Sequence, residues 1–452
     1  MTNGLPGLII AAPASNGGKT VLTLALLRHL RDLADQIPVA FKTGPDYIDP
    51  AFHSAATGDP CWNLDPWAMR PETLAALIAD RDGDKRALAI CEGVMGLYDG
   101  AATGREGKIS GSTADLAALT GWPIIFVVDV GGQGASAAAL VRGFATHRPD
   151  VALGGVVFNR VGGPRHEEIL RQAMAEALPD IPVLGVLPTD SRLTLPSRHL
   201  GLIQAREHPD LETFLNSASS WISEHMDTDA LTRMARPTHL ASVSDKMAPL
   251  LPPLGARIAV AQDDAFAFSY PALLHAWRKA GAEIIFFSPL DNAPPDPTAD
   301  AIYLPGGYPE LNAGRLAGNQ SFLDGLKRAA DAGVKIFGEC GGYMVLGEGL
   351  IDNEGVRHSM AGLLPLVTSF ADRQRHLGYR QMRLKADMAL GKVGDGFRGH
   401  EFHYATIKQE GPGEALFETC DAAGLDTGPC GLIKGSVAGS FIHLIDRAGS
   451  DA

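Results

Sequence analysis

The chain has 452 residues, a length that suggests two or three domains and allows a sizeable core. Its formal net charge of -13 argues against non-specific nucleic-acid binding, because such binders usually present a basic surface. Five scattered cysteines without CxxC pairs, no signal-peptide pattern and no transmembrane-length apolar run predict a cytoplasmic protein with neither structural zinc nor a membrane partner.

The first half of the chain alternates short apolar runs with amphipathic stretches. The apolar runs predict buried strands over Leu8–Ala12, Val39–Lys42, Ala87–Cys91, Ile124–Asp129, Gly155–Phe158 and Val183–Val186. Stretches such as Thr20–Asp32 and His166–Leu178 predict helices between them. Strands that alternate with helices indicate a parallel sheet covered on both faces, so residues 1–226 are expected to form a doubly wound α/β domain.

A loop with the sequence PASNGGKT joins the first predicted strand to the first helix. In this setting Gly18, neighbouring backbone N–H groups and the helix N-terminus can cradle phosphates. Lys19 would lie between the β- and γ-phosphates of ATP, and the Thr20 hydroxyl would bind Mg²⁺. Pro13 stands where the strict pattern has glycine, so the alternative is a glycine-rich turn with a chance GKT. The position on the first strand of a doubly wound sheet favours a nucleotide site.

A loop rich in charged residues, FKTGPDYIDPAFH, follows the second predicted strand. Its polar members are Lys42, Asp46, Tyr47, Asp49 and His53. Loops at the carboxyl ends of parallel strands face the ligand crevice, so Lys42 is a candidate to hold an anion there. Asp46 is a candidate to bind Mg²⁺ or to orient the substrate. The alternative for Asp46 is a turn formed by Gly-Pro-Asp alone.

Two later strand ends add further candidates to this crevice. Glu92 ends the third predicted strand and, beside a phosphate loop, is the leading ligand for Mg²⁺. Asp99 follows on a loop between glycines. Asn159 ends another strand, and its amide could read an adenine edge, although a turn or capping role is equally compatible with the sequence.

The pattern weakens after Trp221, and residues 227–254 predict an interdomain linker that could include a short helix. A second alternating region, residues 255–448, then predicts another doubly wound domain that becomes richer in β-structure beyond residue 360. Its predicted elements are strands over Arg257–Ala261, Glu283–Phe287, Ala301–Leu304 and Val334–Gly338, and a helix over Ser269–Ala280 that is closed by Gly281.

The segment FGECGGYMVLGEG places Cys340 between an apolar strand and a helical pattern. A nucleophile on a sharp strand-to-helix turn needs small neighbours, and the helix N-terminus is expected to lower the thiol pKa. The N–H groups of Gly341 and Gly307, the latter in YLPGGYPE, are candidate oxyanion donors. His443, in GSFIHLI, is the candidate base. The alternative for Cys340 alone is an inert buried thiol.

Together these motifs resemble a known family. FGECGGYMVLG, LPGGYPE and GSFIHL are similar to the triad-type class I glutamine amidotransferase domain of cobyric-acid and cobyrinic-acid synthases. APASNGGKT is similar to the variant phosphate loop of that group and of dethiobiotin synthetase. FKTGPDYIDPAFH, PSRHLGL, LGYR and RGHEFHYA resemble the cobyrinic acid a,c-diamide synthase branch, including its hydrogenobyrinic acid version. The resemblance spans the chain from about Gly7 to about Leu444, apart from the predicted linker.

The resemblance implies a P-loop NTPase-like synthetase domain fused to a glutamine amidotransferase domain. The implied enzyme is a ligase that uses ATP, Mg²⁺ and glutamine to amidate two acetate groups of a corrin polycarboxylate, hydrogenobyrinic or cobyrinic acid, in cobalamin biosynthesis. A homodimer is retained as a candidate assembly. One alternative is a,c-diamidation of another tetrapyrrole such as nickel-sirohydrochlorin. Another is a regulatory P-loop ATPase with an inactive amidotransferase domain.

The resemblance also implies roles for individual residues. Cys340 is the implied nucleophile and His443 its base. Lys19 and Thr20 are implied in nucleotide binding, and metal or substrate handling is implied for Asp46, Tyr47, Glu92 and Asp99. The usual His-x-Glu partner of the base is missing, because Ile445 stands two residues after His443. Glu401 and Asp446 are the candidates for this third position.

Overall fold

The computed structural model describes residues 4–33, 35–103, 109–198, 201–240 and 250–449. These residues form two compact units. The first comprises the described parts of Met1–Trp67, Leu74–Gly100 and Ile109–Met247. The second comprises the described parts of Ala68–Thr73, Ala101–Lys108 and Ala248–Ala452. No helix in the described ranges is long and apolar enough to cross a membrane.

The first unit is built on a predominantly parallel sheet. Its order is β3-β2-β4-β1-β5-β6-β7, with the short β10 paired antiparallel to β1. The strands are β1 (Pro6–Ala11), β2 (Ile37–Thr43), β3 (Trp62–Leu64), β4 (Ala87–Glu92), β5 (Ile124–Asp129), β6 (Leu153–Val161), β7 (Val183–Pro188) and β10 (Arg236–Pro237). The central strands are buried on both faces, which explains why they appear in the sequence as continuous apolar runs.

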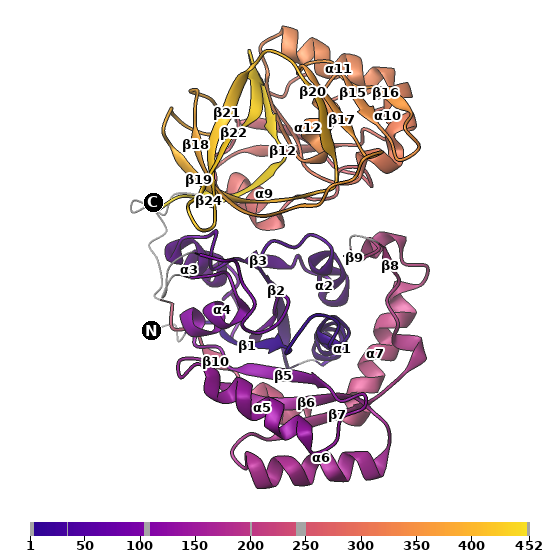
Figure 1. Cartoon of the computed structure of the whole chain (residues 1–452), viewed down its shortest axis with the longest axis vertical. Coiled ribbons are helices and arrows are strands. Elements are labelled where there is room, and N and C mark those ends of the chain that lie inside the picture. Colours follow the sequence, from indigo (N-terminus) through magenta and orange to yellow (C-terminus); the bar gives the residue numbers. More distant parts are fainter. Residues whose placement is uncertain (1–3, 34, 104–108, 199–200, 241–249, 450–452) are drawn as a thin grey trace. The chain divides into compact units, whose positions relative to one another are not determined.

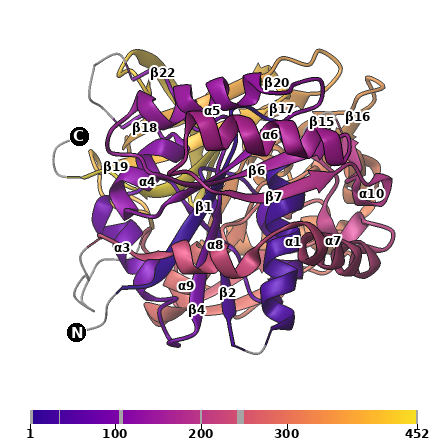
Figure 2. The ribbon, with the colours of Figure 1, turned by 90° about the horizontal axis from the view of Figure 1, so that it is seen from below.

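Helices cover both faces of this sheet. Figures 1 and 2 show α1 and α7 side by side on one face and α5 and α6 together on the other. The helices are α1 (Lys19–Asp32), α2 (Asp49–Thr57), α3 (Pro71–Ala79), α4 (Thr113–Thr120), α5 (Ser136–His147), α6 (Pro164–Ala177), α7 (Leu211–His225) and α8 (Thr228–Met234). A two-stranded ribbon is formed by β8 (Ser197–Arg198) and β9 (Gly201–Leu202). The predicted doubly wound domain is confirmed.

The strand order brings three loops to one edge of the sheet. β1 lies between β4 and β5, and β2 is the next strand beyond β4. Because these strands are parallel, the loops after β1, β2 and β4 all leave from the same edge. The phosphate loop, the charged loop and Glu92 are therefore neighbours in space although they are far apart in the chain.

The stretch expected to be a linker begins inside the first unit. It contains α8, and Arg236 and Pro237 in β10 pair with Gly7 and Pro6 of β1. Residues 241–249 lie outside the described residues. Leu250 and Leu251, just beyond them, are buried among residues that belong to the second unit.

The second unit contains a larger mixed sheet. Its order is β12-β11-β13-β14-β23-β22-β21-β18-β19-β24, in which the first four pairings are parallel and the others antiparallel. The strands are β11 (Arg257–Ala261), β12 (Glu283–Phe287), β13 (Ala301–Leu304), β14 (Lys335–Glu339), β18 (His376–Leu384), β19 (Gly396–His403), β21 (Glu414–Asp421), β22 (Asp426–Lys434), β23 (Val437–Ser440) and β24 (Ile442–Arg447). The four predicted strands and the richer β-content of the C-terminal region are confirmed.

Helices and a smaller sheet complete the second unit. The helices are α9 (Pro271–Lys279), α10 (Ala313–Gly318), α11 (Gln320–Asp331) and α12 (Gly341–Leu346). The smaller sheet contains β15 (Gly349–Ile351), β16 (Arg357–Ser359), β17 (Leu366–Ser369) and β20 (Thr406–Glu410). A short 3₁₀ turn spans Pro309–Asn312 in this unit, and two others span Ser191–Leu193 and Ala205–Glu207 in the first unit.

One continuous segment takes part in the middle of the mixed sheet and at one of its ends. β23 pairs with β14, while β24, which begins after the single residue Phe441, pairs with β19 at the end of the strand order. The antiparallel strands therefore curl back toward β14. This curl brings His400 of β19 directly opposite His443 of β24.

Candidate active sites

The phosphate loop has the backbone that a nucleotide cradle requires. Gly18, at the N-terminus of α1, has φ 96°, and Asn16 earlier in the loop has φ 63°. A Cβ atom on Gly18 would lie 2.2 Å from Asn159 Nδ2, so a larger residue would displace that side chain. The loop therefore depends on glycine for both its conformation and its packing.

Lys19 and Thr20 lie at the first turn of α1. Lys19 Nζ donates to the carbonyls of Ala14 (3.1 Å) and Met95 (2.6 Å), which hold the ammonium group over the loop. Burial lowers the pKa of Lys19. Thr20 Oγ1 donates to Glu92 Oε1 at 2.7 Å. The structure therefore brings together the phosphate-loop hydroxyl and the carboxylate that the sequence predicts as metal ligands.

Glu92 is the most enclosed carboxylate of this group, with an exposed fraction of 1%. Lys42 Nζ lies 3.1 Å from its Oε1, and His53 Nε2 lies 2.7 Å from its Oε2. Burial alone would raise the pKa of Glu92. The charge of Lys42 and the contacts with His53 and Thr20 hold that pKa well below its usual range, so Glu92 is ionised.

Lys42 links Glu92 to the loop that follows β2. Its Nζ lies 2.5 Å from Asp49 Oδ2 and 3.6 Å from Asp46 Oδ2. Burial lowers the pKa of Lys42, but the three carboxylates around it together raise that pKa well above its ordinary value. Burial and the neighbouring Asp46 raise the pKa of Asp49 to about 7. The crevice therefore contains a buried cation among more acidic groups than it can neutralise.

The other predicted residues of the first unit lie around this centre. Asp46 accepts hydrogen bonds from the N–H groups of Ile48 (2.9 Å) and Asp49 (3.1 Å), so it forms a turn, which is the alternative role that the sequence allows. Its second oxygen faces Lys42. Tyr47 follows on the same loop and is half-buried. Asp99 is exposed and accepts from Gly96 N–H at 2.9 Å.

Asn159 lies against the phosphate loop. Its Nδ2 donates to the Gly17 carbonyl at 3.1 Å, and its Oδ1 accepts from the N–H of Arg160 at 2.9 Å. In this conformation Asn159 supports the loop backbone. Each end of the amide keeps capacity for one more hydrogen bond, so its predicted contact with adenine stays a prediction.

Cys340 occupies a strained turn between β14 and α12. Its backbone has φ 48° and ψ -105°, a conformation that few non-glycine residues adopt. The turn fits because its neighbours are glycines: a Cβ on Gly342 would lie 2.0 Å from the Leu304 carbonyl oxygen, and one on Gly338 would lie 2.7 Å from Leu346 Cδ1. This is the sharp strand-to-helix turn that the sequence predicts.

The imidazole of His443 and the predicted oxyanion donors converge on Cys340. A Cβ on Gly306 would lie 2.4 Å from His443 Cε1, 3.2 Å from its Nε2 and 3.3 Å from Cys340 Cβ. A Cβ on Gly341 would lie 3.1 Å from the Gly307 nitrogen. The thiol, the imidazole and these two backbone N–H groups therefore surround one small space.

The expected low pKa of Cys340 is wrong for this structure. Burial raises the pKa of the Cys340 thiol to about 12, although the Gly341 N–H acts in the opposite direction. Burial, together with His400 and His403, lowers the pKa of His443 to about 3. Because α12 has only six residues and the site is enclosed, desolvation outweighs the effect of the helix N-terminus. The resting pair is a neutral thiol beside a neutral imidazole.

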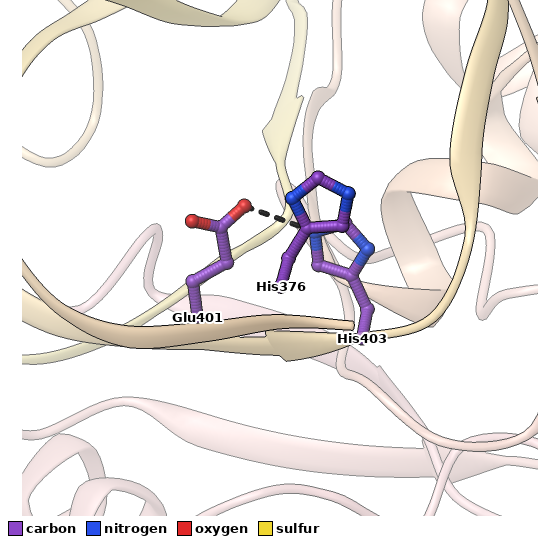
Figure 3. A group of neighbouring side chains, drawn as sticks. All are labelled: His376, Glu401 and His403. Atoms are coloured by element: carbon purple, nitrogen blue, oxygen red, sulfur yellow. Dashed lines mark hydrogen bonds and ion pairs between the residues drawn. The ribbon is translucent and has the colours of Figure 1, made fainter. Parts of the chain in front are cut away.

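Both candidates for the third member of this site bind other partners. Asp446 is fully buried and accepts from Arg70 N, Nε and Nη2 at 2.9–3.1 Å and from Thr73 Oγ1 at 2.6 Å. Glu401 pairs with Arg380 Nη2 at 2.7 Å and with His403 Nε2 at 2.9 Å. Figure 3 shows this carboxylate aimed at the neighbouring histidines. These contacts do not support either residue as the partner of His443.

His376, Glu401 and His403 also place one potential metal-ligand atom each within 4.8 Å of one another. The rings of His376 and His403 are stacked, with centroids 4.6 Å apart and an angle of 11° between planes (Figure 3). Nitrogen lone pairs lie in the ring plane, so two parallel rings cannot both point at one ion. Arg380 also competes for Glu401. We interpret this group as an ion-pair network.

Three residues close to the reacting groups received no role from the sequence. Asp49 and His53 are four residues apart on α2, a spacing that places them on the same helix face and could have indicated a shared partner. Glu339 precedes Cys340, and its Oε2 lies 4.0 Å from His443 Nδ1. No sequence spacing predicts the Glu339 contact, because it depends on β23, which leads into β24, pairing with β14.

We expect slow alkylation of Cys340 by iodoacetamide at pH 7, with a rate that rises about tenfold per pH unit up to about pH 9. The reason is that a thiol whose pKa is raised to about 12 is protonated throughout this range. Mass spectrometry of the Cys340 peptide measures the rate, and Cys340→Ser identifies the labelled site. Fast labelling at pH 7 with a plateau would show that the thiolate is already formed.

Comparison with known proteins agrees with the two predicted domain types. A CobQ/CobB/MinD/ParA nucleotide binding domain matches residues 8–203, and a CobB/CobQ-like glutamine amidotransferase domain matches residues 257–449. Proteins named hydrogenobyrinate a,c-diamide synthase are 54% identical over 448 residues in Sinorhizobium sp, 52% over 450 in Brucella anthropi and 53% over 444 in Rhizobium meliloti. These alignments cover 97–99% of this chain and 99–100% of each relative. The chain therefore belongs to the hydrogenobyrinate a,c-diamide synthase family of glutamine-dependent ligases.

Proposed function

We propose that the protein amidates the a- and c-acetate carboxylates of hydrogenobyrinic acid, or of its cobalt-containing counterpart cobyrinic acid, with ATP and with ammonia from glutamine. The observation that carries this proposal is the presence, in one chain, of a phosphate loop joined to Glu92 and a strained Cys340 turn beside His443. Full-length similarity to hydrogenobyrinate a,c-diamide synthases supports the choice of substrate.

The residues after β1 and β4 fit ATP and Mg²⁺. The glycine backbone at Gly18 leaves the phosphate cradle free of a Cβ, and Lys19 supplies a nearby cation. Thr20 Oγ1 and Glu92 Oε1, 2.7 Å apart, are the hard oxygen donors that Mg²⁺ prefers. Bound Mg²⁺ would offset negative charge on the β- and γ-phosphate oxygens.

The residues around Lys42 take part in phosphorylation of the substrate carboxylate, the first step of the synthetase reaction. An acetate oxygen of the macrocycle attacks the γ-phosphorus of ATP, the bond to the bridging oxygen breaks, and ADP leaves. Ammonia attacks the acyl phosphate, expels phosphate and loses a proton to give the amide. Lys19 stabilises the transferring phosphoryl group, and Asp46 positions the Lys42 ammonium group, which orients the incoming carboxylate.

In the second unit the neutral thiol and imidazole act together. Cys340 attacks the glutamine carboxamide as His443 takes the thiol proton, and His443 passes that proton to the departing ammonia. The N–H groups of Gly307 and Gly341 stabilise the oxyanion that forms. Water then hydrolyses the glutamyl thioester and releases glutamate.

Two alternatives are less well supported. Diamidation of nickel-sirohydrochlorin uses the same chemistry, but the full-length relatives carry the hydrogenobyrinate name. A regulatory ATPase with an inactive amidotransferase domain does not explain why Cys340 and His443 lie beside the same small space. A homodimer stays a prediction.

Incubation with ATP, glutamine and a panel of tetrapyrrole acids, followed by mass spectrometry, tests the function. We expect a gain of two amide groups on hydrogenobyrinic or cobyrinic acid. Cys340→Ala should abolish this glutamine-supported reaction and keep the reaction with free ammonium, because the synthetase residues are untouched. Loss of both reactions by a folded Cys340→Ala protein would contradict the two-site scheme, and amidation of another macrocycle alone would replace the substrate.

Lys19→Ala should reduce ATP-dependent amidation by a factor on the order of 10² or more, because a charge acting on the phosphoryl group is lost. Glutamate release from glutamine should remain. Lys85→Ala, which removes an exposed lysine of the same unit, is the matched control. Near-normal turnover by Lys19→Ala would mean that PASNGGKT does not bind the phosphates.

Asp46→Asn separates the charge of Asp46 from its turn. The amide oxygen can still accept from Ile48 and Asp49, whereas the negative charge facing Lys42 is removed. We expect amidation to fall about tenfold or more while the melting temperature and glutamate release stay near wild type. Asp46→Ala, which also breaks the turn, is the comparison. Equal losses in both half-reactions of Asp46→Asn would show that Asp46 only stabilises the fold.

A further inference from the structure

The side of the His443 ring that faces away from Cys340 is directed at a buried carboxylate. The Cε1 and Nε2 atoms face the space beside Gly306 and Cys340, and Nδ1 lies 4.0 Å from Glu339 Oε2. We propose that Glu339, the residue immediately before the nucleophile, is the positioning carboxylate of His443 and the missing third member of the site. This inference rests on the proposed glutaminase reaction.

Glu339 is held firmly at this position. Its Oε2 accepts from the Tyr303 hydroxyl at 2.6 Å, and its Oε1 accepts from the N–H of Leu444 at 3.0 Å. Leu444 is the residue after His443, so the Glu339 carboxylate is hydrogen-bonded to the backbone of β24, the strand that carries His443. A carboxylate oxygen can accept two hydrogen bonds, which leaves Oε2 able to accept from His443 Nδ1–H as well.

The strained turn at Cys340 explains how the adjacent residues Glu339 and Cys340 can face opposite sides of the His443 imidazole. At the Cys340 φ of 48° the chain changes direction, so the Glu339 side chain leaves β14 before the turn and Cys340 projects after it. Close packing with the neighbouring strand needs glycine, because a Cβ on Gly439 would lie 2.6 Å from the Gly338 carbonyl oxygen. The backbone of the segment that leads to His443 is thereby brought near Glu339.

A nearby carboxylate has a chemical purpose in this site. When Cys340 transfers its proton, His443 becomes an imidazolium in an enclosed space, and an uncompensated buried cation is costly. An anionic Glu339 offsets that charge and orients the ring so that Nε2 faces the sulfur. The distance of 4.0 Å is longer than a hydrogen bond, and we expect it to shorten when the imidazolium forms.

Glu339→Gln tests this inference because it keeps the size and the acceptor oxygen of the side chain but removes its charge. We expect kcat for glutamate release to fall on the order of 10²-fold with little change in KM, while ammonium-dependent amidation and the melting temperature stay near wild type. Tyr303→Phe is the matched control, since it removes an anchor of Glu339 and keeps the charge. Its loss should be several times smaller.

The pH dependence of glutamate release distinguishes a positioning role of Glu339 from a merely structural one, because a structural role would not change that dependence. The titratable groups around Glu339 are Tyr303 on β13, with Tyr270 beyond it, Cys340 on the same turn and His443 on β24. Burial raises the pKa of Glu339 to about 7. The carboxylate is charged above that pH and neutral below it, so wild-type kcat/KM for glutamate release should fall as the pH drops through about 7. Glu339→Gln should lose this inflection.

The outcomes separate the two proposals. A Glu339→Gln protein with wild-type kcat, or one that keeps the wild-type inflection, would overturn the role of Glu339. Equal losses in Glu339→Gln and Tyr303→Phe would overturn it too, because they would indicate a purely structural anchor. If the wild-type protein itself released no glutamate, the proposed function would fail instead.

Discussion

The synthetase half of this protein depends on keeping one carboxylate charged while it is buried. An ionised group taken out of water is costly unless cations and hydrogen-bond donors surround it. Glu92 obtains these partners from three separate elements: Thr20 on α1, Lys42 on β2 and His53 on α2. The contacts fix the phosphate loop and the charged loop relative to β4. The requirement to neutralise Glu92 thus determines how the crevice is assembled.

The amidotransferase half depends on a different constraint, which is the close approach of backbone segments from neighbouring strands and turns. Glycines at 306, 338, 342 and 439 lie where a Cβ would come within 3 Å of other atoms. Their small size allows β13, β14 and β23 to pack so tightly that Cys340, His443 and Glu339 meet in a site with little solvent. The same enclosure keeps the thiol and the imidazole neutral at rest, so the proposed glutaminase reaction requires proton transfer to accompany attack on glutamine.

The sequence was sufficient for features that repeat locally or carry a motif. The parallel strands, the phosphate loop and the turn at Cys340 all leave a pattern within about a dozen residues. Features that depend on distant packing were not predictable. Burial reversed the expected pKa shift of Cys340. Asp446 is three residues from His443 in sequence, yet its carboxylate accepts hydrogen bonds from Arg70 and Thr73. Glu339 meets His443 only because β24 curls back toward β14.

The pairing of Asp446 with Arg70 and Thr73 bears on how far the two halves are separable as modules. The short stretch Ala68–Thr73 comes from the synthetase part of the sequence but packs with the amidotransferase unit. A fragment cut at the apparent linker would leave Asp446 buried without its cation, an arrangement that costs about 3–5 kcal/mol when a buried pair is broken. The boundary between the two units therefore does not coincide with one cut in the chain, because a short piece of the N-terminal sequence supplies buried partners to the C-terminal unit.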